Sequence, residues 1–423
     1  MSNKLAQLTG SREYLALSTE DKKFVTQLCE HWRFSLQQIR QIIRVGRDLE
    51  TWSEGSLAAL WGDLLPEKEG DRNELENRFR QFTASWENLK NSPKDYRGFS
   101  PGKIIIPPAE MKALDDGRRI LGDCPVASLK TRCCNLKTLD AVAGCGFDCS
   151  YCSIQSFYTG NTILFHEDLK AKLAALNLDP DKSYHIGTGQ SSDSLMWGNR
   201  KGLLEDLFAF ARENPNVILE LKTKSDNVGE LLSLDVPPNV LLTWSLNTPT
   251  IIDAEERLTA SLEKRLDAAR RCADARLPVG FHLHPMVWYK GWESEYADLF
   301  GAMTSRFTAE EVVTVSMGTL TFIKPVLKKL RERPIHSKIL QMPLEDAAGK
   351  YSYPLSVKTE LFRAAVEGLK DWKDRVFFYM CMEDPELWEP VFGRAYKSNA
   401  EFEEDMIYTY NHKLSDIFDR RKL

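Results

Sequence analysis

The chain has 423 residues, nine cysteines and a formal net charge of −5 at neutral pH. The sequence contains no apolar run of about 18 residues that would predict a membrane span, and its N-terminus lacks the apolar core of a signal peptide. We therefore expect a cytoplasmic protein with reduced thiols. The acidic balance argues against a protein that coats nucleic acid by bulk charge.

The first hundred residues are predicted to be helical. Helical periodicity extends over Glu20–Trp32 and Phe34–Leu49. Arg40, Arg44 and Arg47 form a stripe on the second of these helices. Such a stripe is typical of a solvated helix face, and contact with nucleic acid is the alternative interpretation.

After Pro108, short β-branched runs alternate with longer helical stretches. This alternation predicts an α/β fold with a parallel sheet, and six units favour a partial (β/α)6 barrel of the TIM type, with its chemistry at the carboxyl ends of the strands. The predicted strands are Thr138–Ala143, Ser183–Gly187, Val217–Lys222, Val240–Ser245, Val279–His284, Val312–Met317 and Val376–Met380. The predicted helices are Glu167–Leu176, Lys201–Glu213, Ser261–Ala275, Ser294–Thr304 and Val357–Leu369.

Four segments are expected along the chain. They are a helical region over 1–100, a lead-in over 101–135 that carries Cys124, Cys133 and Cys134, a barrel over 136–335, and a C-terminal helix and strand extension over 336–423.

Three cysteines follow the first predicted barrel strand in a C-x3-C-x2-C pattern, Cys145, Cys149 and Cys152. Three thiolates on one loop can surround a soft metal centre. A structural zinc site wants four ligands, which Cys124, Cys133 or Cys134 would have to complete. A [4Fe–4S] cluster held by three cysteines leaves one iron open to another ligand. The three upstream cysteines could instead hold an auxiliary cluster or be buried thiols.

This motif resembles that of the radical S-adenosylmethionine superfamily. The resemblance implies that S-adenosylmethionine binds the open iron and that reduction releases a 5′-deoxyadenosyl radical, which abstracts a substrate hydrogen. It also implies an electron donor such as flavodoxin or ferredoxin. Tyr151 stands where the superfamily has a residue beside the adenine.

From Cys133 to Asp384 the chain further resembles the spore photoproduct lyase family of DNA repair enzymes. The resemblance implies that Lys224 meets the cofactor carboxylate and that Ser245 and Asn247 lie near the cofactor. Gly187 and Gly189 would allow its close approach. The matching blocks are Tyr151–Gln155, Leu221–Lys224, Trp244–Asn247, Arg265–Arg270, Gly280–Phe281, Gly291–Glu293 and Gly349–Tyr353.

The chain also departs from that family. Gln190 occupies the place of the cysteine that donates hydrogen to the repaired product, and Ser153 replaces a tyrosine of the relay. Met342–Ala348 is neutral to acidic where the family carries a basic, DNA-contacting stretch. Cys381, just after the last predicted strand, is a candidate replacement donor; a buried small side chain is the alternative.

Two further groups are open to more than one interpretation. His282 and His284 share one strand face and are either substrate contacts or structural histidines. Trp288, Tyr289 and Trp292 could stack on a nucleobase or pack around the Gly291 turn.

We expect a radical enzyme that cleaves a C–C bond in repair of DNA pyrimidine photoproducts or in related nucleic-acid chemistry. The catalytic candidates are Gln190, Tyr151 and Cys381. The alternatives are a radical enzyme acting on a peptide or small molecule, and a non-catalytic iron–sulfur or zinc protein that binds nucleic acid.

Overall fold

The computed structural model describes residues 3–62, 71–102, 109–114, 117, 119–124, 130–153, 162–347 and 349–422. Ile154, Gln155 and Ala348 of the sequence blocks above lie outside these residues. The chain divides into two units. Unit 1 comprises Met1–Ile104 and Arg331–Pro343, and unit 2 comprises Ile105–Leu330 and Leu344–Leu423.

Unit 1 is helical, as the sequence predicts. Its helices pack around apolar side chains, among them Val25, Ile43 and Trp52. Ser35 and Gln38 form a capping box that fixes the start of α4. Its elements are α1 (Asn3–Ala6), α2 (Arg12–Leu15), α3 (Thr19–His31), α4 (Leu36–Trp52), α5 (Leu57–Trp61), α6 (Arg72–Asn91) and the short η3 (Ile339–Gln341).

Part of the arginine stripe serves this packing. The Arg47 guanidinium donates to the carbonyl of Ala16 at 3.2 Å. The Arg44 guanidinium lies 5.9 Å from the centre of the Trp86 ring. Arg40 is exposed. Two of the three arginines therefore hold elements of unit 1 together.

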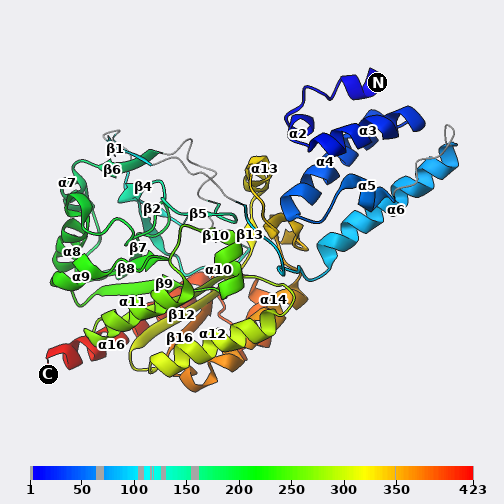
Figure 1. Cartoon of the computed structure of the whole chain (residues 1–423). Helices are drawn as coiled ribbons and strands as arrows, with labels where there is room; N and C mark the ends of the chain where they lie inside the picture. The colour runs from blue at the N-terminus through cyan, green and yellow to red at the C-terminus, as the bar shows by residue number, and fades with distance from the viewer. Residues whose placement is uncertain are drawn as a thin grey trace. The chain divides into compact units, whose positions relative to one another are not determined.

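Unit 2 is built on an eight-stranded sheet with the order β16-β12-β11-β9-β8-β7-β3-β2 (Figure 1). All neighbours from β3 to β16 are parallel, and β2 is an antiparallel edge strand. The predicted partial barrel is confirmed. The strands are β2 (Leu121–Asp123), β3 (Lys137–Leu139), β7 (Tyr184–Gly187), β8 (Val217–Thr223), β9 (Val240–Ser245), β11 (Val279–Met286), β12 (Val312–Thr319) and β16 (Phe377–Met380).

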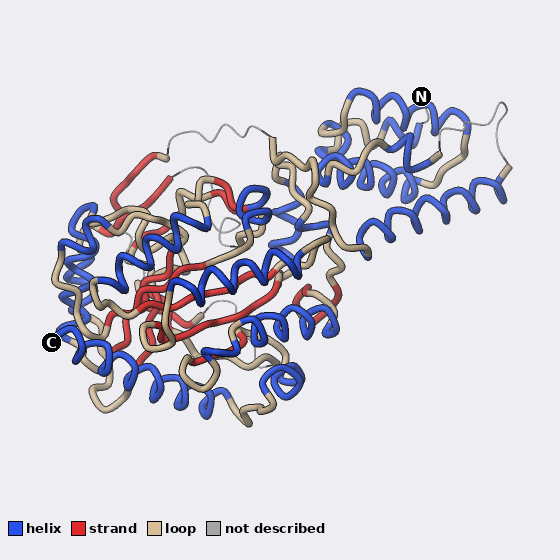
Figure 2. The backbone as a smooth tube through the Cα atoms, turned by 60° about the horizontal axis from the view of Figure 1, so that its bottom comes forward, coloured by secondary structure: helices blue, strands red, loops and turns tan. Residues whose placement is uncertain are grey.

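Helices cover the strands of unit 2 (Figure 2). Strands β9 and β12 are buried along their whole length, which explains their nearly continuous apolar sequences. No described helix combines the length and the apolar character needed to cross a membrane. The helices are α7 (Leu169–Ala174), η2 (Arg200–Gly202), α8 (Leu203–Glu213), α9 (Gly229–Ser233), α10 (Pro249–Glu255), α11 (Leu262–Asp274), α12 (Trp292–Arg306), α13 (Lys324–Glu332), α14 (Leu355–Gly368), η4 (Lys370–Trp372), η5 (Pro385–Leu387), α15 (Trp388–Phe392) and α16 (Asn399–Lys422).

The predicted strand Thr138–Ala143 is wrong as a single element. The chain bends at Ala141, so β3 stays in the large sheet while β4 (Val142–Ala143) joins β6 (Thr162–His166) and β1 (Glu110–Leu114) in another sheet. Two smaller sheets pair β5 (Asp148–Cys149) with β10 (Glu256–Arg257), and β15 (Lys350–Ser352) with β13 (Thr321–Phe322) and β14 (Glu345–Ala347).

Helix α16 connects the two sides of the curled sheet. Near its start, the Asn399 side chain accepts a hydrogen bond from the backbone of Cys133, just before β3. Farther along, the Tyr410 ring packs against His185 of β7 and Phe377 of β16. The C-terminal helix is therefore part of the barrel's packing.

Candidate functional site

A cavity of about 300 Å³ opens at the carboxyl ends of the central strands of unit 2. Its walls come from the ends of β7, β8, β9, β11, β12 and β16 and from the loops around them. This is the edge at which the sequence predicts the chemistry. Seven of the nine cysteines line it, namely Cys124, Cys133, Cys134, Cys145, Cys149, Cys152 and Cys381.

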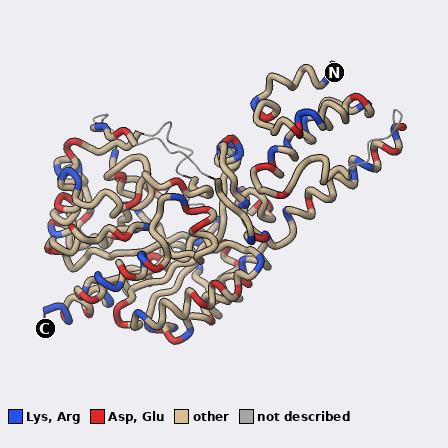
Figure 3. The backbone as a smooth tube through the Cα atoms, in the orientation of Figure 1, with Lys and Arg blue, Asp and Glu red and all other residues tan. Residues whose placement is uncertain are grey.

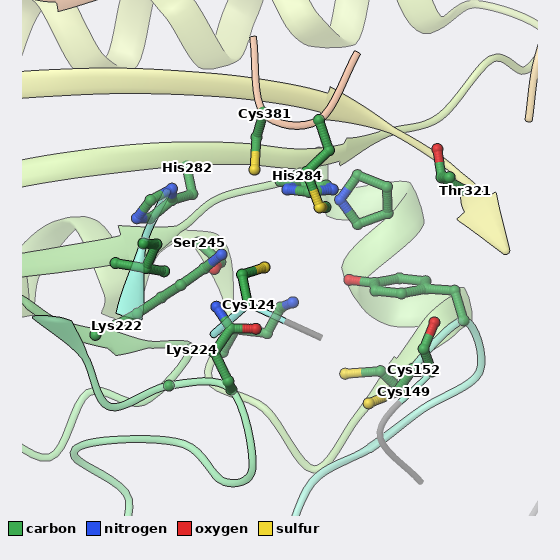
Figure 4. A pocket seen from close by; sticks show the side chains of 18 of the residues that line it. Cys124, Cys149, Cys152, Lys222, Lys224, Ser245, His282, His284, Thr321 and Cys381 are labelled. Carbon is green, nitrogen blue, oxygen red and sulfur yellow. The ribbon is translucent and has the colours of Figure 1, made fainter. Parts of the chain in front are cut away.

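The three motif cysteines all reach this cavity, and Figure 4 shows Cys149 and Cys152 close together at one end. Their loop is anchored to the chain after α10. Cys149 pairs with Glu256 in the β5–β10 ladder, and the backbone amide of Ser150 donates to the carbonyl of Glu255 at 2.8 Å. The loop is therefore held by backbone hydrogen bonds from a distant part of the chain.

A buried polar network supports the same loop. The Tyr151 hydroxyl donates to the Glu256 carboxylate, and the Arg265 guanidinium bonds Glu256 at 2.6 Å and the carbonyl of Ser245 at 2.8 Å. Arg265 is fully buried. Because burial is costly for an unpaired charge, this network fixes the cysteine loop relative to the end of β9.

Lys224 lies over this network. Its ammonium group is 5.2 Å from the centre of the Tyr151 ring and 3.9 Å from Glu256. Burial alone would lower the Lys224 pKa, but Glu256 and Cys149 raise it above its usual value. Lys224 is therefore a protonated amine at the wall of the cavity, next to the cysteine loop.

The donor set of the motif fits an iron–sulfur cluster better than a single ion. Among the described residues, no three His, Cys, Asp or Glu side chains are arranged to hold one metal ion. In an iron–sulfur cluster each thiolate binds a different iron, so the three sulfur atoms need not surround a single ion. Burial raises the pKa of Cys145 to about 12, so a cluster would displace thiol protons when it binds.

The predicted glycines and Gln190 line the cavity beside β7. A Cβ atom on Gly189 would lie 2.8 Å from Cβ of Lys222 and 3.0 Å from its carbonyl oxygen, so only glycine fits between these strands. Asp193 ties the same loop to β8, since its carboxylate accepts from Thr223 Oγ1 and the Lys224 amide, both at 2.7 Å.

The structure does not bring Asn247 to the cavity, whereas Ser245 lines it. The Asn247 amide donates to the carbonyl of Pro285 at 2.9 Å, and its oxygen accepts from the Tyr296 hydroxyl at 3.0 Å. Asn247 is fully enclosed by these contacts. Asn247 therefore connects the chain after β9 to β11 and α12, outside the cavity.

The two histidines of β11 line the cavity but differ in their contacts. His282 donates from Nε2 to Glu220 at 2.5 Å, and its Nδ1 bonds Ser316. His284 is half-buried, and burial next to Lys222 holds its pKa well below the usual value. Both ring nitrogens of His282 are therefore held by contacts within the protein, whereas His284 presents a neutral imidazole to the cavity.

The aromatic residues near the Gly291 turn pack within the protein. Tyr289 and Trp292 are buried. The Tyr289 hydroxyl donates to Thr248 Oγ1 at 2.7 Å, and Trp292 packs edge-on against Tyr296. This favours packing over base stacking for these two residues.

Four charged residues of the site were missed by the sequence reasoning, namely Asp193, Glu220, Lys222 and Glu256. A signal for two of them was present: Glu220, Lys222 and Lys224 alternate at the end of an otherwise apolar strand. Residues two apart share a face of a strand, so this pattern indicates a polar cavity wall. No sequence pattern marks Glu256 and Asp193, because contacts with other parts of the chain place them in the site.

Taken together, these features define an α/β partial barrel with a cysteine-rich cavity at the carboxyl edge of its parallel sheet. Residues 138–355, just over half of the chain, match the family model "Spore photoproduct lyase". The chain therefore belongs to the spore photoproduct lyase family of radical S-adenosylmethionine enzymes.

Individual relatives are distant. The chain is 24% identical over 223 residues to a spore photoproduct lyase of Clostridium acetobutylicum, covering 51% of this chain and 64% of that protein. It is 28% identical over 163 residues to the Bacillus subtilis spore photoproduct lyase, covering 36% of this chain and 47% of that protein. The match thus spans less than two thirds of either relative.

Solved structures show the same fold. Spore photoproduct lyase complexed with dinucleoside spore photoproduct superposes with a TM-score of 0.51 at 21% identity, over 58% of this chain and 76% of that one. A double mutant of that enzyme with bound AdoMet and dinucleoside spore photoproduct gives a TM-score of 0.50 at 20% identity, over the same shares of the two chains.

Proposed function

We propose that this protein is a radical S-adenosylmethionine enzyme whose [4Fe–4S] cluster is held by Cys145, Cys149 and Cys152. The observation that carries the proposal is the meeting of these three thiols with Lys224 and Ser245 in one cavity at the carboxyl edge of the sheet. When bound, the cluster and S-adenosylmethionine would supply a 5′-deoxyadenosyl radical for hydrogen abstraction.

Residues of the chain itself would bind and orient S-adenosylmethionine and shield it from water. The Lys224 ammonium suits the carboxylate of S-adenosylmethionine, and its contact with the Tyr151 ring restricts where it can point. Gly189 leaves the space that a side chain would fill. The walls of the cavity would restrict the access of bulk water to reactive groups bound in it.

A cofactor assay tests this proposal. The full chain is reconstituted anaerobically with iron and sulfide, then mixed with a reductant and S-adenosylmethionine, and 5′-deoxyadenosine is measured. We expect product from the unaltered chain, and at least a tenfold loss of both product and cluster absorption in Cys149→Ala. Cys29→Ala, in unit 1, is the matched control and should behave like the unaltered chain. Full activity in Cys149→Ala would contradict the ligand assignment.

For the substrate we propose a nucleic-acid lesion, with flavodoxin or ferredoxin as the class of electron donor. The support is family membership, and the solved relative that carries dinucleoside spore photoproduct. A base in duplex DNA would have to be extruded to enter the cavity. Acidic and basic residues are mixed along the chain (Figure 3), so DNA contacts would be local.

A peptide or small-molecule substrate is the second candidate. The exposed Glu345 and Asp346 of β14 favour it, because they stand where a basic stretch would contact DNA. Binding of ultraviolet-irradiated and intact oligonucleotides at rising salt separates the candidates. A lesion substrate predicts tighter binding of the irradiated strand and a salt-dependent affinity. Equal, negligible binding of both strands would favour the second candidate.

A further inference from the structure

The four cavity cysteines outside the motif form a second thiol group, made of Cys124, Cys133, Cys134 and Cys381. They come from the ends of β2 and β16 and from the chain before β3. Figure 4 shows Cys124 and Cys381 projecting into the pocket, away from Cys149 and Cys152. The cavity thus has two separate cysteine groups.

Backbone hydrogen bonds hold the second group together. The amide of Cys124 donates to the carbonyl of Leu136 at 3.2 Å, which places Cys124 beside the chain that carries Cys133 and Cys134. An antiparallel bridge joins Arg132 to Glu383, with the Arg132 amide 3.0 Å from the Glu383 carbonyl. Residues 251 positions apart in sequence are thereby fixed next to one another.

Cationic side chains accompany these thiols. Lys222 and Lys350 line the same cavity, and Cys124 and Cys381 are among the groups that act electrostatically on both. The half-buried Lys222 amine makes no hydrogen bond or salt bridge within the described parts of the chain, and Glu220 is the carboxylate that acts on it electrostatically. Two amines and one carboxylate, Glu220, leave an excess of positive charge on this side of the cavity, which favours a further anion. Neutral thiols do not supply one, whereas a thiolate-ligated iron–sulfur cluster carries negative charge.

We propose that Cys124, Cys133 and Cys381 ligate a second iron–sulfur cluster, with Lys222 and Lys350 compensating its charge. Adjacent cysteines rarely both ligate one cluster, so only one of Cys133 and Cys134 is expected to bind iron. The Cys133 and Cys134 side chains are hydrogen-bonded to each other. With Cys133 bound to iron, the Cys134 S–H would be the donor, and such bonds to a ligand sulfur tune the reduction potential. Cys134 is therefore a positioning residue.

The proposal changes the role of Cys381. A thiolate bound to iron has no hydrogen to give, so Cys381 is a ligand here and not the hydrogen donor that would replace the missing cysteine.

Iron and sulfide counts on the full, anaerobically reconstituted chain test this site independently of activity. We expect about eight irons and eight sulfides per chain, because each cubane cluster contains four of each. The variant with Cys124→Ser, Cys133→Ser and Cys381→Ser should retain about four irons and still form 5′-deoxyadenosine. The variant with Cys145→Ala, Cys149→Ala and Cys152→Ala should retain about four irons and form none.

Two outcomes would overturn the second cluster: an unaltered chain with about four irons, or no iron in the motif variant. The motif variant alone decides the matter if the other triple variant does not fold, which circular dichroism would reveal. Cys272→Ser, in α11 outside the cavity, is the control. Absence of 5′-deoxyadenosine from a chain with about eight irons would instead contradict the proposed function and leave the second site standing.

A potentiometric measurement tests the part assigned to Cys134. Loss of its hydrogen bond in Cys134→Ala should move one of two midpoint potentials to a more negative value while the iron count stays unchanged. An unchanged pair of potentials would show that Cys134 has no such role.

Discussion

At the scale of single residues, one carboxylate organises the floor of the cavity. Glu220 accepts hydrogen bonds from His185 at 2.7 Å, His282 at 2.5 Å and Thr243 at 2.7 Å. Burial would raise the pKa of Glu220, but the two imidazoles hold it well below its usual value. An ionised Glu220 thus fixes the donor nitrogens of both histidines.

The same contacts predict a dependence of stability on pH. Burial, helped by Lys222, lowers the pKa of His282 from 6.5 to about 4 in the folded protein. Between these values the unfolded chain binds a proton that the folded chain does not, so stability falls as the pH decreases through this window. The depressed pKa of Glu220 adds a loss below its unfolded value of 4.5.

Urea unfolding at several pH values measures this effect. From pH 6.5 down to about pH 4, His282→Asn should lose less unfolding free energy than the unaltered chain, by on the order of 1–3 kcal/mol. His412→Asn, an exposed position in α16, is the control and should keep the original slope. Equal slopes in the unaltered chain and His282→Asn would refute the assignment.

At the scale of elements, two strands meet too closely for a side chain between them. The end of β7 approaches β8 so that Gly189 lies against the backbone of Lys222. This approach places the loop carrying Gln190 beside Lys222 of β8. Gly189 is therefore a packing requirement of the site as well as a space for ligand.

Gly189→Ala should lower stability by about 1–3 kcal/mol, as overpacking does, and should weaken binding of S-adenosylmethionine. Gly301→Ala is the matched control, because a Cβ there would meet no atom within 4 Å. In the middle of α12 it should stabilise the protein by about 0.5–1 kcal/mol. Thermal unfolding of both variants is the measurement, and equal melting temperatures would contradict the prediction.

The elements were largely predictable because their signals are local. The apolar runs of β8, β9 and β12 predict buried strands, and the three motif cysteines lie within eight residues of one another. The antiparallel pairing of Cys149 with Glu256 depends on residues more than one hundred positions apart, and so does the placement of Cys381 beside Cys133. The bend at Ala141 was missed because both of its sides have strand-like sequences.

At the scale of the whole molecule, the chain enters unit 1 twice. Segment 331–343 is bound into unit 1 after most of the barrel has been completed. The amide of Ser337 donates to the carbonyl of Thr51 at 2.8 Å, and the buried Lys338 amine donates to the carbonyl of Trp52 at 2.8 Å and pairs with Glu54. The fold of unit 1 therefore requires both of its segments, 1–104 and 331–343.

Lys338→Ala should destabilise unit 1 by about 1.5–3 kcal/mol, since hydrogen bonds to a charged group are lost. Urea unfolding followed by tryptophan fluorescence, together with limited proteolysis, should show earlier unfolding and earlier cleavage within residues 1–104. Lys23→Ala, an exposed change in α3, is the control. An unfolding curve for Lys338→Ala that matches the control would count against the anchoring role.

The bridge between Arg132 and Glu383 sets the order in which this protein can mature. Because synthesis proceeds from the N-terminus, the motif cysteines leave the ribosome long before residue 383 does. The wall that carries Cys381, and the α16 contact to Cys133, exist only once nearly the whole chain has emerged. We therefore expect the cavity to close only after translation, so that a cofactor inserted earlier would meet an open, solvent-filled half-barrel.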